Sequence, residues 1–418
     1  MEENKKILVL GGKPIASLDI VNYAKSKGIY TIVADYLSKD SSLAKKRADQ
    51  TWECSTSEID ELCRMIKEQG VIGVFTGVHE FNIKQALNIC EKMHFPFYCT
   101  KEQWNILSDK HIYKQLFSDF GLPKIKEFYS GKIDKLQIDN IEYPVIVKPT
   151  DGSSGFGVKT CANSEELTTN IKLAVQKSQS SSVLIEEYVE APEVTIFYII
   201  KDGKIMLSAM ADRETYKFEK NVIPLPTLYT FPSEHLPVYE NKFNPKVIDA
   251  LQSTGIQNGM LFMQAFWRND KCLIYDIGFR LTGTQEYNIL SKLCGYNPLE
   301  MLVNYSLTGK MCEEDIEDKV DPYFNGNYAS IITILSNPGK VTSIEGIEVI
   351  NQLPYVEKLL LNHEIGDEIP VSAKGTLVQI MARVFVICET KEQLALTEKT
   401  VRTLFKVRDE FGNNMLIK

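Results

Sequence analysis

The first hundred residues alternate short apolar runs with segments of helical periodicity. Apolar runs at residues 7–10, 30–34 and 71–76 predict strands, and amphipathic segments that reach Tyr23 and span 59–68 predict helices. Strands that alternate with helices are typical of a parallel α/β sheet. We therefore expect an α/β domain at the start of the chain.

The predicted helix at 59–68 has local signals at both ends. Ser57 followed by Asp60 resembles a capping box, in which the two side chains satisfy backbone donors of the first turn. Gly70 stands where a left-handed residue commonly ends a helix. We expect the helix to begin just after Ser57 and to end before Gly70.

The middle of the chain is richer in strands than in helices. A short capped helix follows Ser108 and ends at Gly121, and a second helix runs from Asn297 to Gly309. Successive strands with few helices between them favour an antiparallel sheet in an α+β domain. The predicted strands span residues 145–147, 183–185, 194–200, 204–210, 261–267 and 271–277.

An acidic loop at 313–321 precedes a final strand-rich segment. Residues 391–411 predict a closing helix whose apolar stripe includes Leu394, Ala395 and Val401. The strands before it are predicted at 329–335, 341–344, 356–362, 368–369 and 376–388.

The length of the chain agrees with several domains. At about 150 residues per domain, 418 residues predict two or three domains, each with its own core. The composition shifts divide the chain into a Rossmann-like α/β domain, a central α+β domain and a strand-rich C-terminal domain. We place these domains at residues 1–105, 106–312 and 322–418.

Composition and charge exclude several classes of protein. Hydrophobic residues make up 44% and charged residues 24%, which is typical of a folded globular protein. The net charge is −8, and the sequence has no basic stripe that would attract a phosphate backbone. We therefore expect no nucleic-acid partner. No apolar stretch is long enough for a membrane span or a signal peptide, and nine cysteines contain no C-x-x-C pair. We expect a cytoplasmic protein with reduced thiols.

The strongest chemical signal is a glycine-rich loop after an apolar strand. The strand delivers Lys148 and is followed by Gly152, Gly155 and Gly157, which are spaced by small hydroxyl residues. Such a loop brings backbone N–H groups close to an anion beside the lysine charge. A glycine-rich hairpin without ligand is the alternative for the loop taken alone.

A second signal follows in the segment 183–197. Two strands flank a short polar connection, and Glu186 and Glu193 stand on either side of it. Two carboxylates then face one cleft, and the backbone from Glu187 to Val189 offers the donors and acceptors that an adenine edge and a ribose need.

These segments, in this order, resemble the ATP-grasp superfamily over most of the chain. The resemblance implies that ATP lies between two α+β subdomains, with Lys110 and Lys148 on its α- and β-phosphates. It also implies that Glu186, Glu187 and the backbone of Val189 surround the adenine, and that Glu193 holds the ribose. Ser153, Ser154 and Gly155 would cover the phosphates.

The metal-binding segment departs from the family pattern. Relatives have an acid on one strand and a Glu-x-Asn-x-Arg run on the next, whereas this chain has Gln264 and then Asp276-Ile-Gly278-Phe-Arg280. The resemblance therefore implies that Asp276 and Gln264 hold Mg²⁺, which binds through one or two carboxylates and the substrate's phosphates. Arg280 matches the family's arginine.

The remaining site residues concern the substrates. The resemblance implies that Arg280 and Lys148 are the catalytic residues and that Arg280 also holds the substrate carboxylate or the transferring phosphoryl group. Glu80 follows the third predicted strand and is a second substrate-binding candidate, or else a charge at a helix N-terminus. Arg213 and Lys217 either reach the phosphates or form surface salt bridges.

The leading hypothesis is an ATP-dependent ligase that joins a carboxylate to an amine-type nucleophile through an acylphosphate. The chain is most similar to carbamoyl-phosphate-synthase-like, phosphoribosylglycinamide-synthetase-like and amino-acid ligase members. Its partners would be small carboxylates and amines, with no nucleic acid and no membrane, and a homodimer is a possible assembly. A catalytically altered or regulatory ATP-binding protein is the alternative, motivated by Gln264 and Gly278. A dehydrogenase rests only on Gly11-Gly12 and Asp35, without the G-x-G-x-x-G fingerprint.

Overall fold

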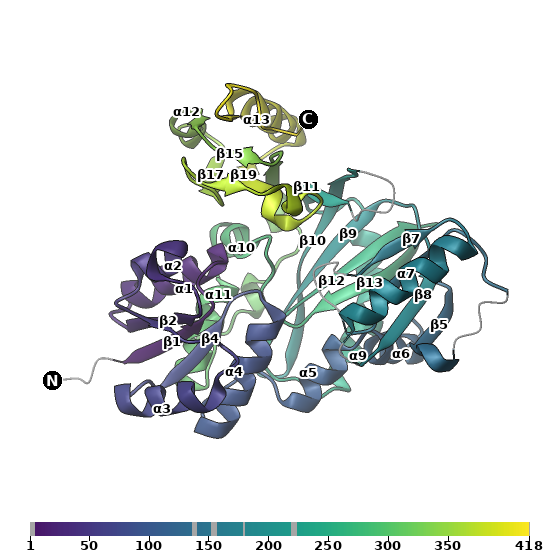
Figure 1. Cartoon of the computed structure of the whole chain (residues 1–418), viewed down its shortest axis with the longest axis horizontal. Coiled ribbons are helices and arrows are strands. Elements are labelled where there is room, and N and C mark those ends of the chain that lie inside the picture. The colour runs from purple at the N-terminus through teal and green to yellow at the C-terminus, as the bar shows by residue number, and fades with distance from the viewer. Residues whose placement is uncertain (1–4, 136–139, 152–156, 179, 219–223, 418) are drawn as a thin grey trace.

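The computed structural model shows a mixed α/β fold built on three main sheets (Figure 1). The parts of the chain that it describes are residues 5–135, 140–151, 157–178, 180–218 and 224–417. The N-terminal part lies beside the large sheet, and the C-terminal segment lies above both (Figure 1). No helix in these ranges is long and apolar enough to cross a membrane.

The N-terminal part contains the parallel sheet that the alternating pattern predicts. Its strand order is β3-β2-β1-β4, and apolar residues of β1 are buried on both faces because helices cover both sides. On one face Ile7 and Val9 pack with Ile20, and on the other face Leu8 packs with Leu62. The elements are β1 (Lys6–Leu10), α1 (Ile15–Ser26), β2 (Tyr30–Asp35), α2 (Leu43–Arg47), β3 (Gln50–Glu53), α3 (Ile59–Gln69), β4 (Gly73–Thr76) and α4 (Glu80–Met93).

The predicted capping box of α3 is wrong, although the predicted end is confirmed. Glu58 is the N-cap residue and its side chain makes no capping hydrogen bond, while the Ser57 hydroxyl pairs with that of Ser55. Gly70 ends the helix at φ 66°, the left-handed conformation that favours glycine. The Ser57 hydroxyl therefore forms a hydrogen bond within the loop before α3 instead of capping the helix.

A small antiparallel sheet follows, in the order β5-β8-β6-β7. Helix α7 packs on it through Leu167 and Ile171, which contact Val145 and Val183 in one apolar cluster. The elements from the second helix pair onward are α5 (Lys101–Ser108), α6 (Lys110–Asp119), β5 (Glu127–Lys132), β6 (Val145–Pro149), β7 (Lys159–Cys161), α7 (Ser164–Lys177) and β8 (Ser182–Glu187).

The largest sheet has eight antiparallel strands in the order β13-β12-β9-β10-β11-β14-β19-β17. Its first five strands come from the central region and its last three from the final segment, so no break in the sheet marks the expected boundary at 312–322. The elements are β9 (Glu193–Lys201), β10 (Lys204–Tyr216), β11 (Leu225–Phe231), α8 (Leu236–Lys242), α9 (Asn244–Gln252), β12 (Gly259–Arg268), β13 (Lys271–Gly278), α10 (Tyr287–Cys294), α11 (Pro298–Thr308), β14 (Tyr328–Leu335), β17 (Val356–Leu361) and β19 (Ile380–Cys388).

The closing helix is shorter than its pattern predicts. It ends at Leu404 because residues 406–408 form a strand with residues 343–345, and Ala395 is exposed while Thr397 takes a buried position. The strand predicted from residue 376 begins at Ile380. The remaining elements are β15 (Gly339–Lys340), β16 (Ser343–Glu345), α12 (Ile347–Asn351), β18 (Glu368–Ile369), α13 (Lys391–Leu404) and β20 (Lys406–Arg408).

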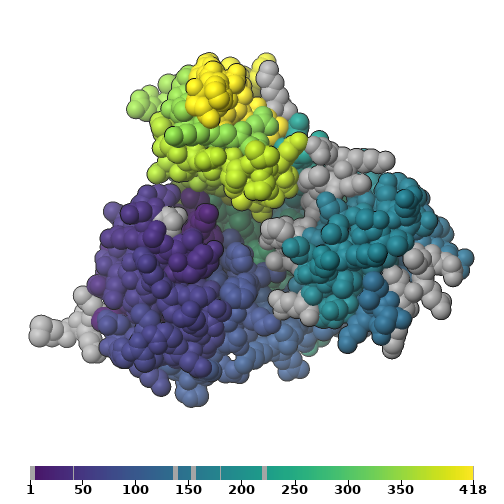
Figure 2. Space-filling view, viewed as in Figure 1, coloured from purple at the N-terminus to yellow at the C-terminus, as the bar shows by residue number. Residues whose placement is uncertain are grey.

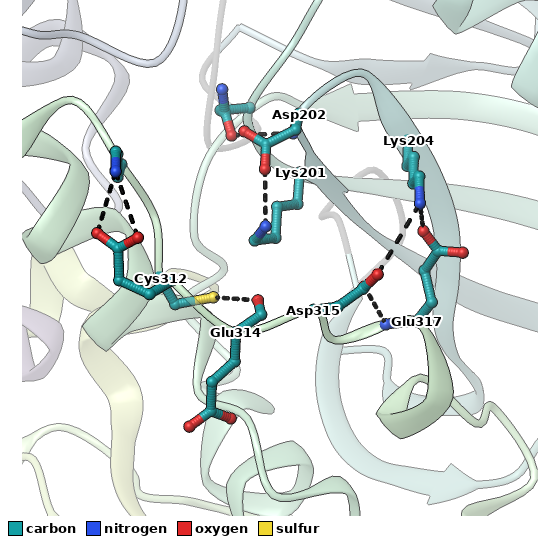
Figure 3. Close-up of polar contacts among 10 residues, drawn as sticks. Lys201, Asp202, Lys204, Cys312, Glu314, Asp315 and Glu317 are labelled. Atoms are coloured by element: carbon teal, nitrogen blue, oxygen red, sulfur yellow. Dashed lines mark hydrogen bonds and ion pairs between the residues drawn. The ribbon is translucent and has the colours of Figure 1, made fainter.

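The acidic loop after α11 packs against the β9–β10 turn (Figure 3). Lys204, at the start of β10, forms ion pairs with Glu317 and, at 4.0 Å, with Asp315. The Cys312 thiol donates to the carbonyl oxygen of Glu314 at 3.3 Å. The loop therefore packs against the turn that joins two inner strands of the large sheet.

Candidate functional site

A cleft of about 320 Å³ lies between the small antiparallel sheet and the large one. Residues from β6, β8, β10, β12, β13 and α6 line it, together with the connection from β8 to β9. Figure 2 shows that the N-terminal part, the C-terminal segment and the small-sheet region surround a recessed centre. The cleft thus lies where two sheets are joined by a short connection, an arrangement that suits an elongated polar ligand.

A triad of buried charges lies at the cleft, and two of its members, Lys148 and Glu186, line it. Lys148 on β6 lies 2.7 Å from one oxygen of Glu186, and Lys114 on α6 contacts the other oxygen. Lys148 lies opposite Leu184 in the register of β6 and β8, so Glu186 is two residues along the neighbouring strand. The side chains of the three residues are 1–9% exposed. Glu186 therefore holds the ammonium group of Lys148, which lines the cleft, and that of Lys114, which is not among the cleft-lining residues.

The electrostatics of this triad follow from its burial. Burial and the nearby charge of Lys148 lower the pKa of Lys114 to about 8. Burial raises the pKa of Glu186, but Lys148 and Lys114 lower it more, and its pKa lies below the ordinary value. Glu186 is thus ionised at neutral pH and keeps two cations in place.

Replacing Glu186 with glutamine is expected to destabilise the protein by about 3 to 5 kcal/mol at pH 7, because two buried lysines lose their counter-charge. A carboxylate whose pKa is depressed by folding stabilises the protein above its ordinary pKa, and this stabilisation is lost as the pH falls through the folded value. Urea unfolding from pH 7 to pH 3 should show a smaller acid-induced loss for Glu186→Gln than for the parent protein. Glu190→Gln, at an exposed carboxylate three residues beyond the end of β8, is the control, and equal acid slopes in all three proteins would contradict the assignment.

The connection from β8 to β9 forms one wall of the cleft. Glu187 forms a two-pronged ion pair with Arg268, at 2.6 and 3.3 Å. Val189 packs with Ile125 and Leu273 in a small apolar cluster. These contacts hold the connection against both sheets, so its backbone has a defined position beside the cleft.

Glu193 begins β9 on the opposite wall and belongs to a second polar cluster. Arg213 forms an ion pair with Glu193 and donates to the Tyr275 hydroxyl at 2.7 Å. The Tyr275 hydroxyl donates to Glu193 at 2.7 Å. Lys217, farther along β10, donates to the Tyr188 hydroxyl at 3.1 Å. Arg213 therefore lines the cleft while it is paired with Glu193, and its contact with phosphates stays a prediction.

The two predicted metal ligands lie side by side. Gln264 on β12 and Asp276 on β13 are register partners, and both line the cleft. Lys110, at the start of α6, lies 3.7 Å from an oxygen of Asp276. Among the described residues there is no cluster of three or more His, Cys, Asp or Glu side chains suited to a metal ion. An ion here would therefore have one carboxylate and one amide oxygen from the protein.

The glycine at 278, where the family has asparagine, has a packing reason. A β-carbon added to Gly278 would lie 2.3 Å from the ring of Phe262, its register partner. The guanidinium of Arg280 lies over that same ring, 4.9 Å from its centre. Phe262 thus occupies the space of the missing side chain and supports Arg280.

Arg280 joins the N-terminal part to the site. Its Nη2 atom donates to Glu80 at 3.1 Å, and Nη1 donates to the carbonyl oxygen of Leu281 at 3.0 Å. Glu80 begins α4, 200 residues earlier in the chain. Burial and the charge of Arg280 lower the pKa of the adjacent His79. The arginine fork is thus oriented by three groups beside the cleft.

The structure brings together nearly all the residues that the sequence singled out. Lys110, Lys148, Glu193, Gln264 and Asp276 line one cleft, as do Glu186, Glu187 and Val189. Glu80 and Arg280 form a pair of their own. Ser153, Ser154 and Gly155 lie outside the described residues. Sequence reasoning missed Lys114, Phe262 and Tyr275; a lysine one helical turn after Lys110 is the only signal that pointed to the first of them.

The N-terminal part does not present a dinucleotide-binding turn. The Gly12 backbone N–H, which faces a phosphate in such proteins, donates to the Asp35 carboxylate at 2.7 Å. Buried Lys45 forms an ion pair with Asp35 at 2.7 Å. Asp35 therefore serves the structure of this turn, which removes the basis of the dehydrogenase alternative.

Sequence comparisons identify related proteins. A family model described as the C-terminus of D-ala D-ala ligase matches residues 116–254. The large chain of carbamoyl phosphate synthase from Clostridium beijerinckii is 22% identical over 362 residues, which cover 82% of this chain and 33% of that protein. The chain spans about a third or less of the length of the first curated relatives it matches.

Solved structures extend the likeness over the whole chain. L-amino acid ligase from Bacillus licheniformis is 15% identical, with a TM-score of 0.78 over 98% of this chain and 100% of that one. The biotin carboxylase domain of 2-oxoglutarate carboxylase from Hydrogenobacter thermophilus, a complex with MgADP, ADP and bicarbonate, is 16% identical. Its TM-score is 0.76 over 99% of this chain and 92% of that one. At these identities, the structures establish a shared fold.

Proposed function

We propose that the chain is an ATP-grasp enzyme and that, within this superfamily, it is an ATP-dependent ligase that joins a carboxylate to an amine nucleophile. One observation carries the proposal. The cleft is lined by Lys110 and Lys148 and also by Asp276 and Gln264. Arg280 lies two residues beyond the end of β13, the strand that carries Asp276. Cations for phosphates, oxygens for a metal ion and a fork for a carboxylate are thus close together.

The proposal assigns the cleft to ATP. Lys110 and Lys148 bind the α- and β-phosphates, Glu193 binds the ribose hydroxyls, and the backbone near Val189 binds the adenine edge. Glu186 acts there through Lys148 and Lys114, whose ammonium groups it holds. Ser153, Ser154 and Gly155 remain the candidates for covering the phosphates. The apolar side chains of the cleft, among them Phe266 and Ile146, are suited to the faces of a base.

Asp276 and Gln264 fit Mg²⁺, because both offer oxygen and stand on neighbouring strands. When bound, Mg²⁺ would neutralise charge on the phosphate oxygens. Two protein ligands are few, but Mg²⁺ commonly keeps several water molecules and takes further oxygens from the phosphates. Lys110, near Asp276, would add positive charge to the same phosphates.

The chemistry needs positioning and charge neutralisation more than a covalent nucleophile. A substrate carboxylate oxygen attacks the γ-phosphorus of ATP, the bond to ADP breaks, and an acylphosphate forms. The amine nitrogen then attacks the acyl carbon and loses a proton, and phosphate leaves with the carboxylate oxygen. Arg280 holds the carboxylate and the transferring phosphoryl group through its planar fork.

The finer layout of the protein is part of the same proposal. Residues 1–105 supply Glu80 beside the acceptor site, residues 106–312 bind Mg-ATP, and residues 322–418 complete the large sheet over the substrates. We also propose that the protein acts in the cytoplasm, where ATP and small carboxylates are available.

The decisive experiment measures ADP release from Mg-ATP with pools of small carboxylates and amines. An active pair should raise ADP release well above the ATP-only rate. With carboxylate labelled by ¹⁸O, one labelled oxygen should appear in the released phosphate, because that oxygen bridges acyl carbon and phosphorus. Unlabelled phosphate would contradict the acylphosphate route.

The alternative, a regulatory ATP-binding protein, predicts a different result. Such a protein would bind Mg-ADP, because the lysines and Asp276 line the cleft, yet no carboxylate and amine pair would raise ADP release. Gln264 and Gly278 motivated this alternative. The packing of Phe262 against Gly278 and Arg280 weakens it, since the missing asparagine is replaced by a support for the arginine.

A further inference from the structure

The C-terminal segment contains a second cavity, which the proposed function does not use. Its volume is about 380 Å³, compared with about 320 Å³ for the proposed ATP cleft, and the two share no lining residue. The last turn of α13, strand β20, one residue of β14 and the segment 414–417 surround it. Cavities of this size commonly hold small organic molecules. We call it the C-terminal cavity.

Three cationic side chains line the C-terminal cavity, namely Arg402, Lys406 and Arg408, and no acidic residue is among its described lining residues. Arg408 is paired with Glu345 at 3.2 Å, whereas no ion pair in the described part of the chain includes Arg402 or Lys406. Glu398, one turn before Arg402 on α13, feels the charge of that arginine but does not line the cavity. Two cations outside any ion pair, at one cavity of a chain whose net charge is −8, are suited to an anion.

Asn414 adds a donor to the C-terminal cavity, and most of the remaining wall is apolar. The Asn414 side-chain oxygen accepts from the backbone N–H of Leu416 at 3.1 Å, so its amide nitrogen is the end that can donate to a ligand. Apart from Thr403, the other lining residues are Ile334, Phe405, Val407, Leu416 and Ile417. Cations and a donor beside an apolar wall fit a molecule with an anionic head and an apolar body.

The end of β10 is connected to both cavities. Thr215 and Lys217 line the proposed ATP cleft, whereas Tyr216, which stands between them, packs against an apolar cluster. Successive side chains of an extended chain point to opposite faces, which accounts for this division. Ile417, which lines the C-terminal cavity, packs against the same cluster, formed by Leu225, Leu335 and Ile380. Packed side chains therefore connect the C-terminal cavity with the piece of β10 that lines the cleft.

Two hydrogen bonds join the wall of the C-terminal cavity to the strands beside this connection. Arg402 donates to the carbonyl oxygen of Thr227 on β11 at 3.0 Å. The backbone N–H of Ile417 donates to the carbonyl oxygen of Leu335 on β14, also at 3.0 Å. Strand β11 pairs with both β10 and β14. A ligand that contacts Arg402 and Ile417 therefore acts on β11 and, through it, on the end of β10.

We propose that the C-terminal cavity binds an organic anion with an apolar body, and that this ligand tightens nucleotide binding in the cleft beside β10. The anionic head contacts Arg402 and Lys406, and the apolar body lies on Phe405 and Ile417. The bound ligand holds Ile417 and β11 in the arrangement that presents Lys217 to the cleft, so the nucleotide meets a site that is already formed. The second half rests on the proposed function, because it takes the other cleft as the ATP site.

Octanoate is a suitable probe, because it combines a carboxylate with an unbranched apolar chain. Calorimetry on the full chain with saturating Mg-ADP should show saturable binding of octanoate at a single site. Octanamide has the same chain without the charge, and acetate has the charge without the chain, so each should bind at least about tenfold more weakly. Equal affinities for octanoate and octanamide would overturn the proposal.

Variants assign the binding to the C-terminal cavity. A double variant, Arg402→Met with Lys406→Met, should lower octanoate affinity by at least about tenfold, and it should fold because both side chains are exposed, which thermal unfolding checks. Lys399→Met is the control, since Lys399 is an exposed lysine of α13 that does not line the cavity, and it should leave the affinity unchanged. If Arg280→Ala abolishes octanoate binding and the double variant does not, octanoate binds as a substrate carboxylate, and the proposal is wrong.

The effect on the cleft is measured as the affinity for Mg-ADP with and without saturating octanoate. The dissociation constant of Mg-ADP should fall by about fivefold or more in the parent protein and stay unchanged in the double variant. Because coupling between two sites is reciprocal, Mg-ADP should tighten octanoate binding by the same factor. A dissociation constant of Mg-ADP that octanoate leaves unchanged or raises contradicts the proposal.

Failure of this proposal and failure of the proposed function give different results. If a carboxylate and amine pair raises ADP release but octanoate does not bind, the proposed function stands and the C-terminal cavity takes no such anion. If Mg-ADP does not bind at all, the proposed function fails. Octanoate binding to the parent protein and to the double variant without nucleotide then still decides whether the cavity takes the anion.

Discussion

Replacing Arg280 with alanine is expected to lower substrate-dependent ADP formation by about a hundred- to a thousand-fold, while ADP affinity stays within a few-fold. Arg280 lies beyond the strand that carries Asp276, and Glu80, the Leu281 carbonyl and the Phe262 ring orient it. A contact that forms mainly in the transition state contributes roughly this much to the rate. Initial rates with a saturating carboxylate and amine pair, together with calorimetry of Mg-ADP binding, measure both quantities.

Two variants sharpen this result. Asp276→Asn should weaken Mg²⁺-dependent ADP binding as well as turnover, because the proposed metal ligand loses its charge. Arg268→Ala removes an arginine that pairs with the cleft-lining Glu187 but does not itself line the cleft, so it is the matched control and should leave most of the activity. If Arg280→Ala and Arg268→Ala lose activity equally, Arg280 has no special role in the reaction.

The second large effect is expected from Lys148. Lys148→Ala removes a charge that faces the phosphates in the proposed complex, and charge-assisted hydrogen bonds of this kind contribute about 1.5–3 kcal/mol. ADP affinity should therefore fall by at least tenfold. Folding should survive, because Lys114 still contacts Glu186 and neutralises it.

Calorimetry of Mg-ADP binding and thermal unfolding check the two parts of this expectation. Lys217→Ala is the matched control, since Lys217 lines the same cleft but bonds to the Tyr188 hydroxyl at its rim. Its effect on affinity should be several times smaller. A folded Lys148→Ala protein with parental ADP affinity would refute the assignment of Lys148 to the phosphates.

Local sequence patterns predicted a helix or strand well where contacts between residues near in sequence are enough to form it. The apolar run of β1 and the helix from Asn297 to Gly309 follow from neighbours within a few residues. The predicted ends failed where a distant strand intervened. Residues 406–408 leave the predicted closing helix because they pair with residues 343–345.

The candidate site shows the same division. Lys148, Glu186 and Asp276 were each singled out from the motif around them, and the structure places all three in one cleft. The ion pair between Glu80 and Arg280 spans 200 residues, and no local pattern indicates it. Lys114 was missed for a similar reason, since only the packing of α6 against β8 turns an ordinary helical lysine into a buried partner of Glu186.

The sequence by itself indicated most of the strands and helices, the cleft-lining motifs and the resemblance to ATP-grasp enzymes, because these depend on periodicity, on glycine and proline, and on residue types at short spacing. Only the tertiary structure decided that the strands of the last segment extend the central sheet, that Asp35 is tied to Lys45, and that Phe262 fills the place beside Gly278. Those outcomes depend on which distant groups compete for the same space and the same hydrogen bonds. These contacts form only in the folded chain, so residues near in sequence do not predict them.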